Sequence, residues 1–263
     1  MFMKLKRLIL LSIVFAVILL AGCDKTPETG NTQQLLLYCG AGIRPVAEDL
    51  ISTFEAEHGV KVAVDFAGSE VLLSKIRLTR QGDLYMPGDK YYVDQAAAED
   101  MVYTQKSVCY WIPTILVRKG NPKNIQTIND LLKDGVRLGL GDAALCAIGK
   151  ITRKVLEKNN IAWADVEKNL KFHSQTVNEL GMQIHAGSLD AVIVWDAMAR
   201  YYSRDGEQVA IPPEKNEIST VDIGVLSFSK NKSFAEKFVD FTASKQGQAI
   251  FRKHDYSTEA PNL

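Results

Sequence analysis

LLLYCGAG at residues 35–42 and FAGS at residues 66–69 are the two stretches that decide the fold of this chain. The first is an apolar run that ends in a turn of small residues, which is typical of a buried strand leading into a helix. The second is the end of a segment at 60–66 that alternates apolar and polar residues, which predicts a strand, together with the turn that follows it. After the first turn, Pro45 suits the first turn of a helix, and helical spacing of apolar residues continues until Gly59. After the second turn, Ser69 is placed to cap another helix. The chain therefore begins as an alternation of strands and helices.

The alternation continues along the chain. Further strands are expected at residues 82–86, 110–118, 137–141, 170–172, 191–195 and 221–228. Further helices are expected at residues 127–133, 149–159, 176–186, 233–244 and 246–254. Repeated β-α-β units predict an α/β fold with mainly parallel sheets and flanking helices, with ligands at the carboxyl ends of the strands.

Two sets of these units predict a two-lobed clamp with a ligand cleft between its lobes. The strands at 110–118 and 221–228 are long enough to cross from one lobe to the other. The predicted divisions are a signal peptide at 1–22, a flexible tether at 23–34, the first part of lobe 1 at 35–112, lobe 2 at 113–220, and a crossing strand with the return to lobe 1 at 221–263.

The N-terminal segment predicts export from the cytoplasm. Basic residues at 4–7 precede an apolar run at 8–21, which is shorter than the roughly 20 residues of a comfortable membrane span. Leu20-Ala21-Gly22-Cys23 resembles a bacterial lipobox, in which the Cys23 thiol is acylated and becomes the mature N-terminus. The resemblance implies a protein that lipid anchors to the outer side of the cytoplasmic membrane, the periplasmic side if there are two membranes. An ordinary signal peptide with an incidental cysteine is the alternative.

The charge balance excludes nucleic acid as a partner. The 263 residues carry 31 basic and 31 acidic side chains, so no basic field is available to track phosphates. The sequence has neither an HExxH helix nor a G-x-S-x-G elbow, and we predict no catalytic site and no cofactor. A hydrolytic pair at His173-Ser174 is a weaker alternative. Recognition is expected to come from a local site.

Three cysteines remain after Cys23, and their odd number leaves several possibilities open. Cys39 and Cys146 lie in predicted β-α turns, and Cys109 lies at the start of a crossing strand. They could form one disulfide and a free thiol, or pack as small buried hydrophobes. They could also converge with Glu70 on Cu(I), Zn(II) or a trivalent arsenic-type ligand, which is the alternative function.

Several motifs run along the chain in the order found in a known family. They are Leu37-Tyr38-Cys39-Gly40-Ala41-Gly42, Phe66-Ala67-Gly68-Ser69, Gly82-Asp83-Leu84-Tyr85 with Gly88-Asp89-Lys90, Gly139-Leu140-Gly141-Asp142, Gly187-Ser188-Leu189-Asp190-Ala191 and Lys245-Gln246-Gly247-Gln248-Ala249-Ile250-Phe251. With these motifs the chain resembles the periplasmic molybdate/tungstate-binding proteins of ABC importers. The resemblance covers nearly all of the mature chain.

The resemblance implies a monomeric protein that binds a dehydrated tetrahedral oxyanion between its lobes. It implies delivery of that anion to a membrane permease and its ATPase. The family uses hydroxyl groups and backbone N–H groups at helix starts, which is how helix N-termini hold anions. The matching positions are Gly42, Ser69, Ile148, Val177 and Trp195, where Gly42 and Trp195 replace hydroxyl-bearing residues.

Two charged residues lie beside these positions. Arg44 follows the first turn and could form paired hydrogen bonds to an oxyanion in compensation for the missing hydroxyls. A solvated surface arginine is the alternative reading. Glu70 is expected to point to solvent as a first-turn helix charge, because acidic side chains are favoured there.

Overall fold

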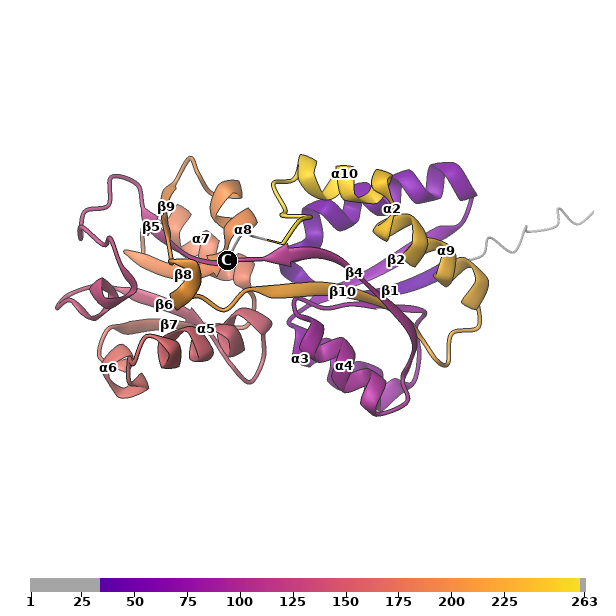
Figure 1. Cartoon of the computed structure of the whole chain (residues 1–263), viewed down its shortest axis with the longest axis horizontal. Coiled ribbons are helices and arrows are strands. Elements are labelled where there is room, and N and C mark those ends of the chain that lie inside the picture. The colour runs from indigo at the N-terminus through magenta and orange to yellow at the C-terminus, as the bar shows by residue number, and fades with distance from the viewer. Residues whose placement is uncertain (1–33, 261–263) are drawn as a thin grey trace, which may run out of the picture. The chain divides into compact units, whose positions relative to one another are not determined.

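Two five-stranded sheets form the framework of the molecule (Figure 1). The computed structural model describes residues 34–260, and the predicted signal peptide, Cys23 and the tether up to residue 33 lie outside the described residues. Gln34, predicted as the end of the tether, is the first residue of a strand. Sheet A has the strand order β2(Lys61–Ala67), β1(Gln34–Gly40), β3(Leu84–Met86), β10(Ser219–Leu226), β4(Val102–Trp111). Sheet B has the order β7(Leu170–Ser174), β6(Leu138–Gly141), β8(Ala191–Trp195), β5(Pro113–Arg118), β9(Gly206–Ala210).

Helices flank both sheets. Sheet A with η1(Ala41–Ile43), α2(Arg44–His58), α3(Ser69–Thr79), α4(Lys90–Ala98), α9(Lys232–Ala243) and α10(Lys245–Lys253) is called lobe 1. Sheet B with η2(Ile128–Leu132), α5(Ala147–Lys158), α6(Trp163–Glu167), α7(Val177–His185) and α8(Asp196–Tyr201) is called lobe 2, and η3(Pro213–Lys215) leads back towards β10. Residues from Gln34 onward form one compact unit. No helix within 34–260 is long and apolar enough to cross a membrane.

The predicted two-lobed α/β class is confirmed, and the sheets prove to be mixed. In sheet A, β1 pairs in parallel with β2 and β3, whereas β10 is antiparallel to β3 and β4. Sheet B repeats the arrangement, with β6 parallel to β7 and β8, and β5 antiparallel to β8 and β9. Parallel pairing therefore holds for the β-α-β units, while β10 in sheet A and β5 in sheet B run the other way.

The prediction of a single strand at 110–118 is wrong. β4 ends at Trp111, which pairs with Ser219 in sheet A, and β5 begins at Pro113, which pairs with Trp195 in sheet B. One continuous strand cannot stay hydrogen-bonded to neighbours in two separate sheets, so the backbone pairing is interrupted at Ile112. The Ile112 N–H donates instead to the Asp196 carboxylate, at 3.4 Å.

Helix starts follow the turns at the strand ends, with one correction. Ser69 does not cap α3: Gly68 is the N-cap residue, and Ser69 is the first residue inside the helix. Helix α4 was not predicted, although Asp89 precedes it as a capping residue and accepts the Tyr91 N–H at 2.7 Å. The additional elements α6, α8 and β9 are short, and their sequences carry weak periodicity.

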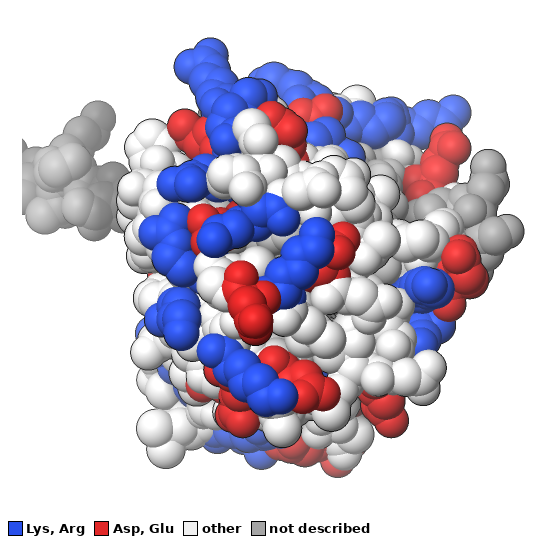
Figure 2. Space-filling model, turned by 90° about the vertical axis from the view of Figure 1, so that its left-hand side faces the viewer, with Lys and Arg blue, Asp and Glu red and all other residues white. Residues whose placement is uncertain are grey.

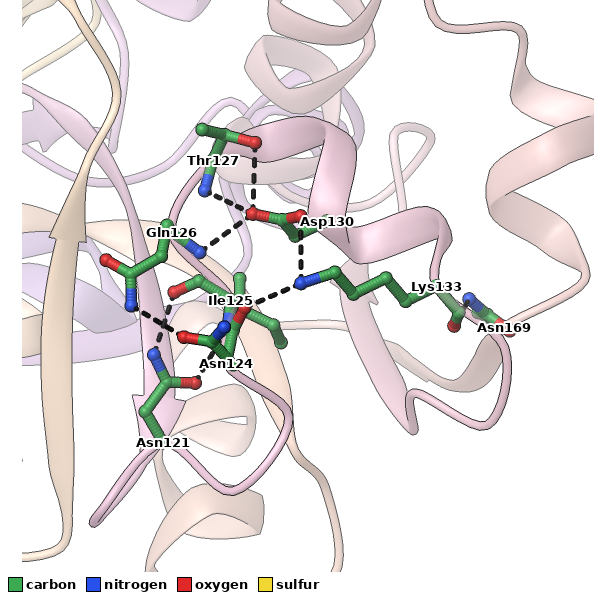
Figure 3. A network of polar contacts seen from close by, with 8 residues as sticks. All are labelled: Asn121, Asn124, Ile125, Gln126, Thr127, Asp130, Lys133 and Asn169. Atoms are coloured by element: carbon green, nitrogen blue, oxygen red, sulfur yellow. Dashed lines mark hydrogen bonds and ion pairs between the residues drawn. The ribbon is translucent and has the colours of Figure 1, made fainter.

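A polar network shapes the loop between β5 and β6 (Figure 3). The Asp130 carboxylate accepts the backbone N–H groups of Gln126 at 2.9 Å and Thr127 at 2.8 Å, and Lys133 lies 3.0 Å away. The backbone hydrogen bond from Gln126, supported by Lys133 and Thr127, holds the pKa of Asp130 at about 2. The ionised carboxylate therefore stabilises this loop.

We expect Asp130→Asn to lower the free energy of unfolding at neutral pH by about 1–2 kcal/mol, allowing for partial solvent screening. Because the folded-state pKa is depressed, the contribution is fully present above about pH 4 and is lost as the pH falls towards 2. Urea unfolding of both proteins at pH 7 and at about pH 2.5 measures this. An equal gap between them at the two pH values would contradict the assignment.

Candidate functional site

A small cavity lies where the two lobes meet. Lobe 1 lines it with Gly40, Ala41, Gly42, Ala67, Gly68, Ser69, Gly88 and Trp111, and lobe 2 with Cys146, Ala147, Ile148, Thr176, Val177 and Trp195. Its volume is about 20 Å³, somewhat more than the roughly 10–15 Å³ that one water molecule needs. Pockets for drug-sized molecules are about 300 Å³ or larger. The cavity in this closed arrangement therefore suits a compact guest.

The N-termini of helices from both lobes meet at this cavity. Gly68 precedes α3, Cys146 precedes α5 and Thr176 precedes α7, and all three N-cap residues line the cavity. The first N–H groups of a helix have no partner within it, and the helix dipole adds partial positive charge there. No Lys, Arg, His, Asp or Glu side chain lines this part of the described chain. The site thus favours an anion through neutral donors.

Charges of both signs are mixed on the face of lobe 2 that points away from lobe 1. Figure 2 shows the end of the described region formed by lobe 2, where basic and acidic side chains are interspersed. This arrangement agrees with the equal numbers of basic and acidic residues in the chain.

Ser69 is the best-placed hydroxyl in the cavity. Its side chain is 3% exposed, and its Oγ accepts the Gly88 N–H at 3.0 Å. The Tyr85 hydroxyl donates to the Ser69 carbonyl at 2.9 Å and fixes the backbone at the start of α3. Because the Gly88 N–H uses only a lone pair of Oγ, the Ser69 proton remains available to a guest.

Thr176 is a second hydroxyl, which the sequence analysis missed. Its Oγ1 caps α7 by accepting the Glu179 N–H at 3.4 Å, which again leaves the hydroxyl proton available. A threonine three residues before a glutamate at the start of an apolar helix is a recognisable capping pattern and could have identified it.

The two lobes contact each other directly beside the cavity. The Glu70 N–H of lobe 1 donates to the Leu145 carbonyl of lobe 2 at 3.3 Å. The Lys150 ammonium of α5 lies 4.2 Å from the centre of the Tyr91 ring of α4. A Cβ atom added at Gly68 would lie 2.6 Å from the Leu145 oxygen, so a side chain there is incompatible with this approach. The structure therefore represents lobes that have closed on the cavity.

Five of the six predicted ligand-binding positions come together. Gly42, Ser69, Ile148, Val177 and Trp195 all line the cavity, and their roles as donors stay predictions. Arg44 is the exception. Its exposed guanidinium lies 4.0 Å over the Phe66 ring and 3.4 Å from Glu48, because the first turn of α2 directs it away from the cavity. The compensating role expected for Arg44 is therefore not supported.

The structure does not assemble the alternative thiol site. All three cysteines are free and buried, and no group of three or more His, Cys, Asp or Glu side chains among residues 34–260 could hold a metal ion. Burial raises the pKa of the Cys39 and Cys109 thiols well above the usual range and that of Cys146 to about 11. Glu70 pairs with Arg77 at 3.2 Å. Protonated, separated thiols are poor soft-metal ligands, because the thiolate is the binding form.

The motif order, the two lobes and the cavity between them agree with a comparison of the whole sequence with known protein families. The sequence model of the family of bacterial extracellular solute-binding proteins matches residues 35–257. The chain belongs to this family. The cavity of this solute-binding protein is accordingly its candidate solute site, and members of the family bind solutes for transport.

Several individual proteins are similar to this chain. A Haemophilus influenzae protein, named only as a binding protein, is 29% identical over 217 residues, which cover 82% of this chain and 88% of the relative. The molybdate-binding protein ModA of Escherichia coli is 22% identical over 232 residues, covering 85% and 89%. The fold also matches the sulfate-binding protein SubI of Mycobacterium tuberculosis with a TM-score of 0.77, at 18% identity, covering 87% and 88%.

Proposed function

We propose that this protein captures a compact tetrahedral oxyanion, molybdate or tungstate, in the cavity between its lobes. It then delivers the anion to the membrane permease of an ABC importer, and it is held at the membrane by lipid on Cys23. The observation that carries the proposal is the convergence of helix N-termini from both lobes on a small cavity without charged side chains.

The set of hydrogen-bond donors suits an anion that has lost its hydration shell. A dehydrated dianion needs hydrogen-bond donors on all sides, and helix starts supply them as backbone N–H groups without a counter-charge. Ser69 and Thr176 add hydroxyl protons from opposite lobes. A ligand held by both lobes selects the closed state, because it gains contacts there that an open clamp lacks.

The size of the cavity supports the same class of ligand. About 20 Å³ leaves room for a compact ion and not for a sugar or an amino acid in the closed arrangement. The names of the Escherichia coli relative and the Mycobacterium tuberculosis structural neighbour point to two tetrahedral dianions, molybdate and sulfate. Molybdate and tungstate are preferred here because the chain follows the motif order of that family.

Isothermal titration calorimetry of the purified protein tests the proposal. The panel consists of molybdate, tungstate, sulfate and phosphate, with Zn(II) and Cu(I) as soft-metal controls. We expect tight binding of molybdate and tungstate, with one anion per chain. Binding of Zn(II) or Cu(I) without binding of any oxyanion would overturn the proposal in favour of the thiol site.

The lipid anchor makes a separate prediction. We expect Cys23→Ala to release the protein from membranes, because the acylated thiol is its proposed attachment. Membrane fractions washed with high salt and probed for the protein measure this, with Cys109→Ala as a matched control that keeps the lipid. Retention of the Cys23→Ala protein in the washed membranes would contradict a lipid anchor.

A further inference from the structure

Trp111 forms a part of the cavity wall that lies against two glycine turns. It is the last residue of β4, is 2% exposed, and lines the cavity. A Cβ atom added at Gly42 would lie 2.9 Å from Trp111 Cη2, and one added at Gly88 would lie 3.3 Å from Trp111 Cζ3. Both atoms are carbons of the six-membered ring, which has no hydrogen-bonding group of its own. At these turns Trp111 therefore gives the cavity its shape and no polar contact.

The two turns need glycine for space and not for backbone conformation. Neither Gly42 nor Gly88 is among the glycines with a positive φ. At Gly42 an added Cβ would also lie 2.6 Å from Val177 Cγ1, so Trp111 and Val177 together fill the space of a side chain. At Gly88 the Ala147 Cβ lies at 3.3 Å, the same distance as Trp111 Cζ3. The ring of Trp111 thus occupies volume beside both turns that a smaller residue would leave open.

Aromatic neighbours hold the Trp111 ring in place. The ring centre of Trp195, which ends β8 in sheet B, lies 4.6 Å away at an interplanar angle of 46°. The ring centre of Tyr256 lies 6.0 Å away, and the Tyr256 hydroxyl donates to the Gly42 carbonyl at 2.5 Å. Because close-packed side chains transmit strain, the Trp111 ring cannot move aside for a larger guest without disturbing these contacts.

The rest of the lining consists mainly of backbone and small side chains. Trp111 and Trp195 are the largest side chains among the lining residues, and the others are Gly, Ala, Ser, Cys, Thr, Ile or Val. The turns at the helix starts are fixed by the sheets from which they emerge. The size of the cavity on the side of lobe 1 is therefore set by one side chain, Trp111, which reaches both glycine turns.

We infer that Trp111 is a specificity-determining residue, whose six-membered ring limits the site to unsubstituted tetrahedral oxyanions and excludes those that carry an organic group, such as phosphate monoesters. The inference rests on the proposed function. The carbon group of an ester needs space next to one oxygen, and the ring fills the space that the glycines at 42 and 88 would otherwise leave. A pocket that is too small by one methylene discriminates by about tenfold or more.

Competition calorimetry with methyl phosphate as the probe tests the inference. Molybdate is titrated into parent and Trp111→Phe proteins with and without methyl phosphate or inorganic phosphate, at about pH 8, where both competitors are dianions. Phenylalanine keeps an aromatic ring against Trp195 and is smaller than the indole. We expect methyl phosphate to compete with molybdate at least about tenfold better in the variant than in the parent, with little change for inorganic phosphate.

Further variants separate the size of the ring from other effects. Trp111→Leu opens more space and should admit phenyl phosphate as well. Gly88→Ala in the Trp111→Phe protein returns a methyl group to the emptied space and should restore the exclusion of methyl phosphate. Trp163→Phe is the matched control, because the Trp163 ring lies in α6 against Arg153 and does not line the cavity. Thermal unfolding checks that each variant is folded.

The parent protein alone can already contradict the inference. If it bound methyl phosphate as well as it binds inorganic phosphate, Trp111 would not exclude esters, whatever the variants do. The inference would also be overturned if folded Trp111→Phe and Trp111→Leu bound molybdate and rejected methyl phosphate as the parent does, or gained affinity for both phosphates equally. In these cases the proposed function stands. A parent protein that binds no oxyanion would overturn both.

Discussion

Ser69→Ala is expected to weaken molybdate and tungstate binding by roughly ten- to a hundredfold. The hydroxyl lines the cavity, and its proton is available because Oγ accepts the Gly88 N–H. A hydrogen bond to a charged group contributes about 1.5–3 kcal/mol, and each 1.4 kcal/mol is a factor of about ten in affinity. Calorimetric titration of parent and variant measures the loss.

The fold should tolerate this change. The variant leaves the Gly88 N–H without its acceptor, which costs about 1–3 kcal/mol of stability. Ser74→Ala is the matched control, because Ser74 lies exposed on the same helix α3 and should bind as the parent does. If a folded Ser69→Ala protein bound oxyanions with parental affinity, Ser69 would not be a ligand donor.

Gly68→Ala is expected to hinder closure of the lobes. The Gly68 backbone, at φ −64° and ψ 148°, suits alanine, so lobe 1 itself should remain unstrained. In the closed arrangement the new Cβ would lie 2.6 Å from the Leu145 oxygen and 2.8 Å from the Gln175 oxygen, both on the backbone of lobe 2. The lobes must separate to relieve these contacts. Overpacking costs about 1–3 kcal/mol, which corresponds to roughly five- to a hundredfold weaker binding.

Small-angle scattering distinguishes this effect from the loss of a donor. The parent protein should show a smaller radius of gyration with saturating molybdate, whereas Gly68→Ala should keep a larger one under the same conditions. Gly88→Ala is a graded control, because its Cβ would come no closer than 3.3 Å to any neighbour. An identical decrease in parent and Gly68→Ala would show that the contact of Gly68 with lobe 2 is not part of the bound state.

Local sequence patterns predicted much of the framework. The apolar run before Gly40 and the small residues after it gave β1 and the start of α2, because a buried strand needs apolar side chains and a sharp turn needs small ones. The same reasoning located Ser69 beside a helix start, although it assigned the capping role wrongly. Pairing direction was harder, because periodicity shows that a segment is a strand and not which strand lies beside it.

For the candidate site too, some residues could be predicted from the sequence and others could not. Positions at helix starts, such as Ser69 and Ile148, were assigned from the resemblance to a known family, and the structure places both in the lining of the cavity. Trp111 and Thr176 were missed. Trp111 was read as the second residue of one long strand at 110–118, whereas it ends β4, and its ring lines the cavity.

The sequence by itself determined the two-lobed α/β class, and its resemblance to a known family implied which positions at the helix starts lie together. The tertiary structure alone decided which side chains share the cavity. It buried three thiols as separate protonated groups, stacked Arg44 on Phe66, and brought Trp111 of one sheet against Trp195 of the other. The physical reason is that these outcomes depend on packing between segments distant in the chain, whereas helix and strand signals depend on neighbours a few residues apart.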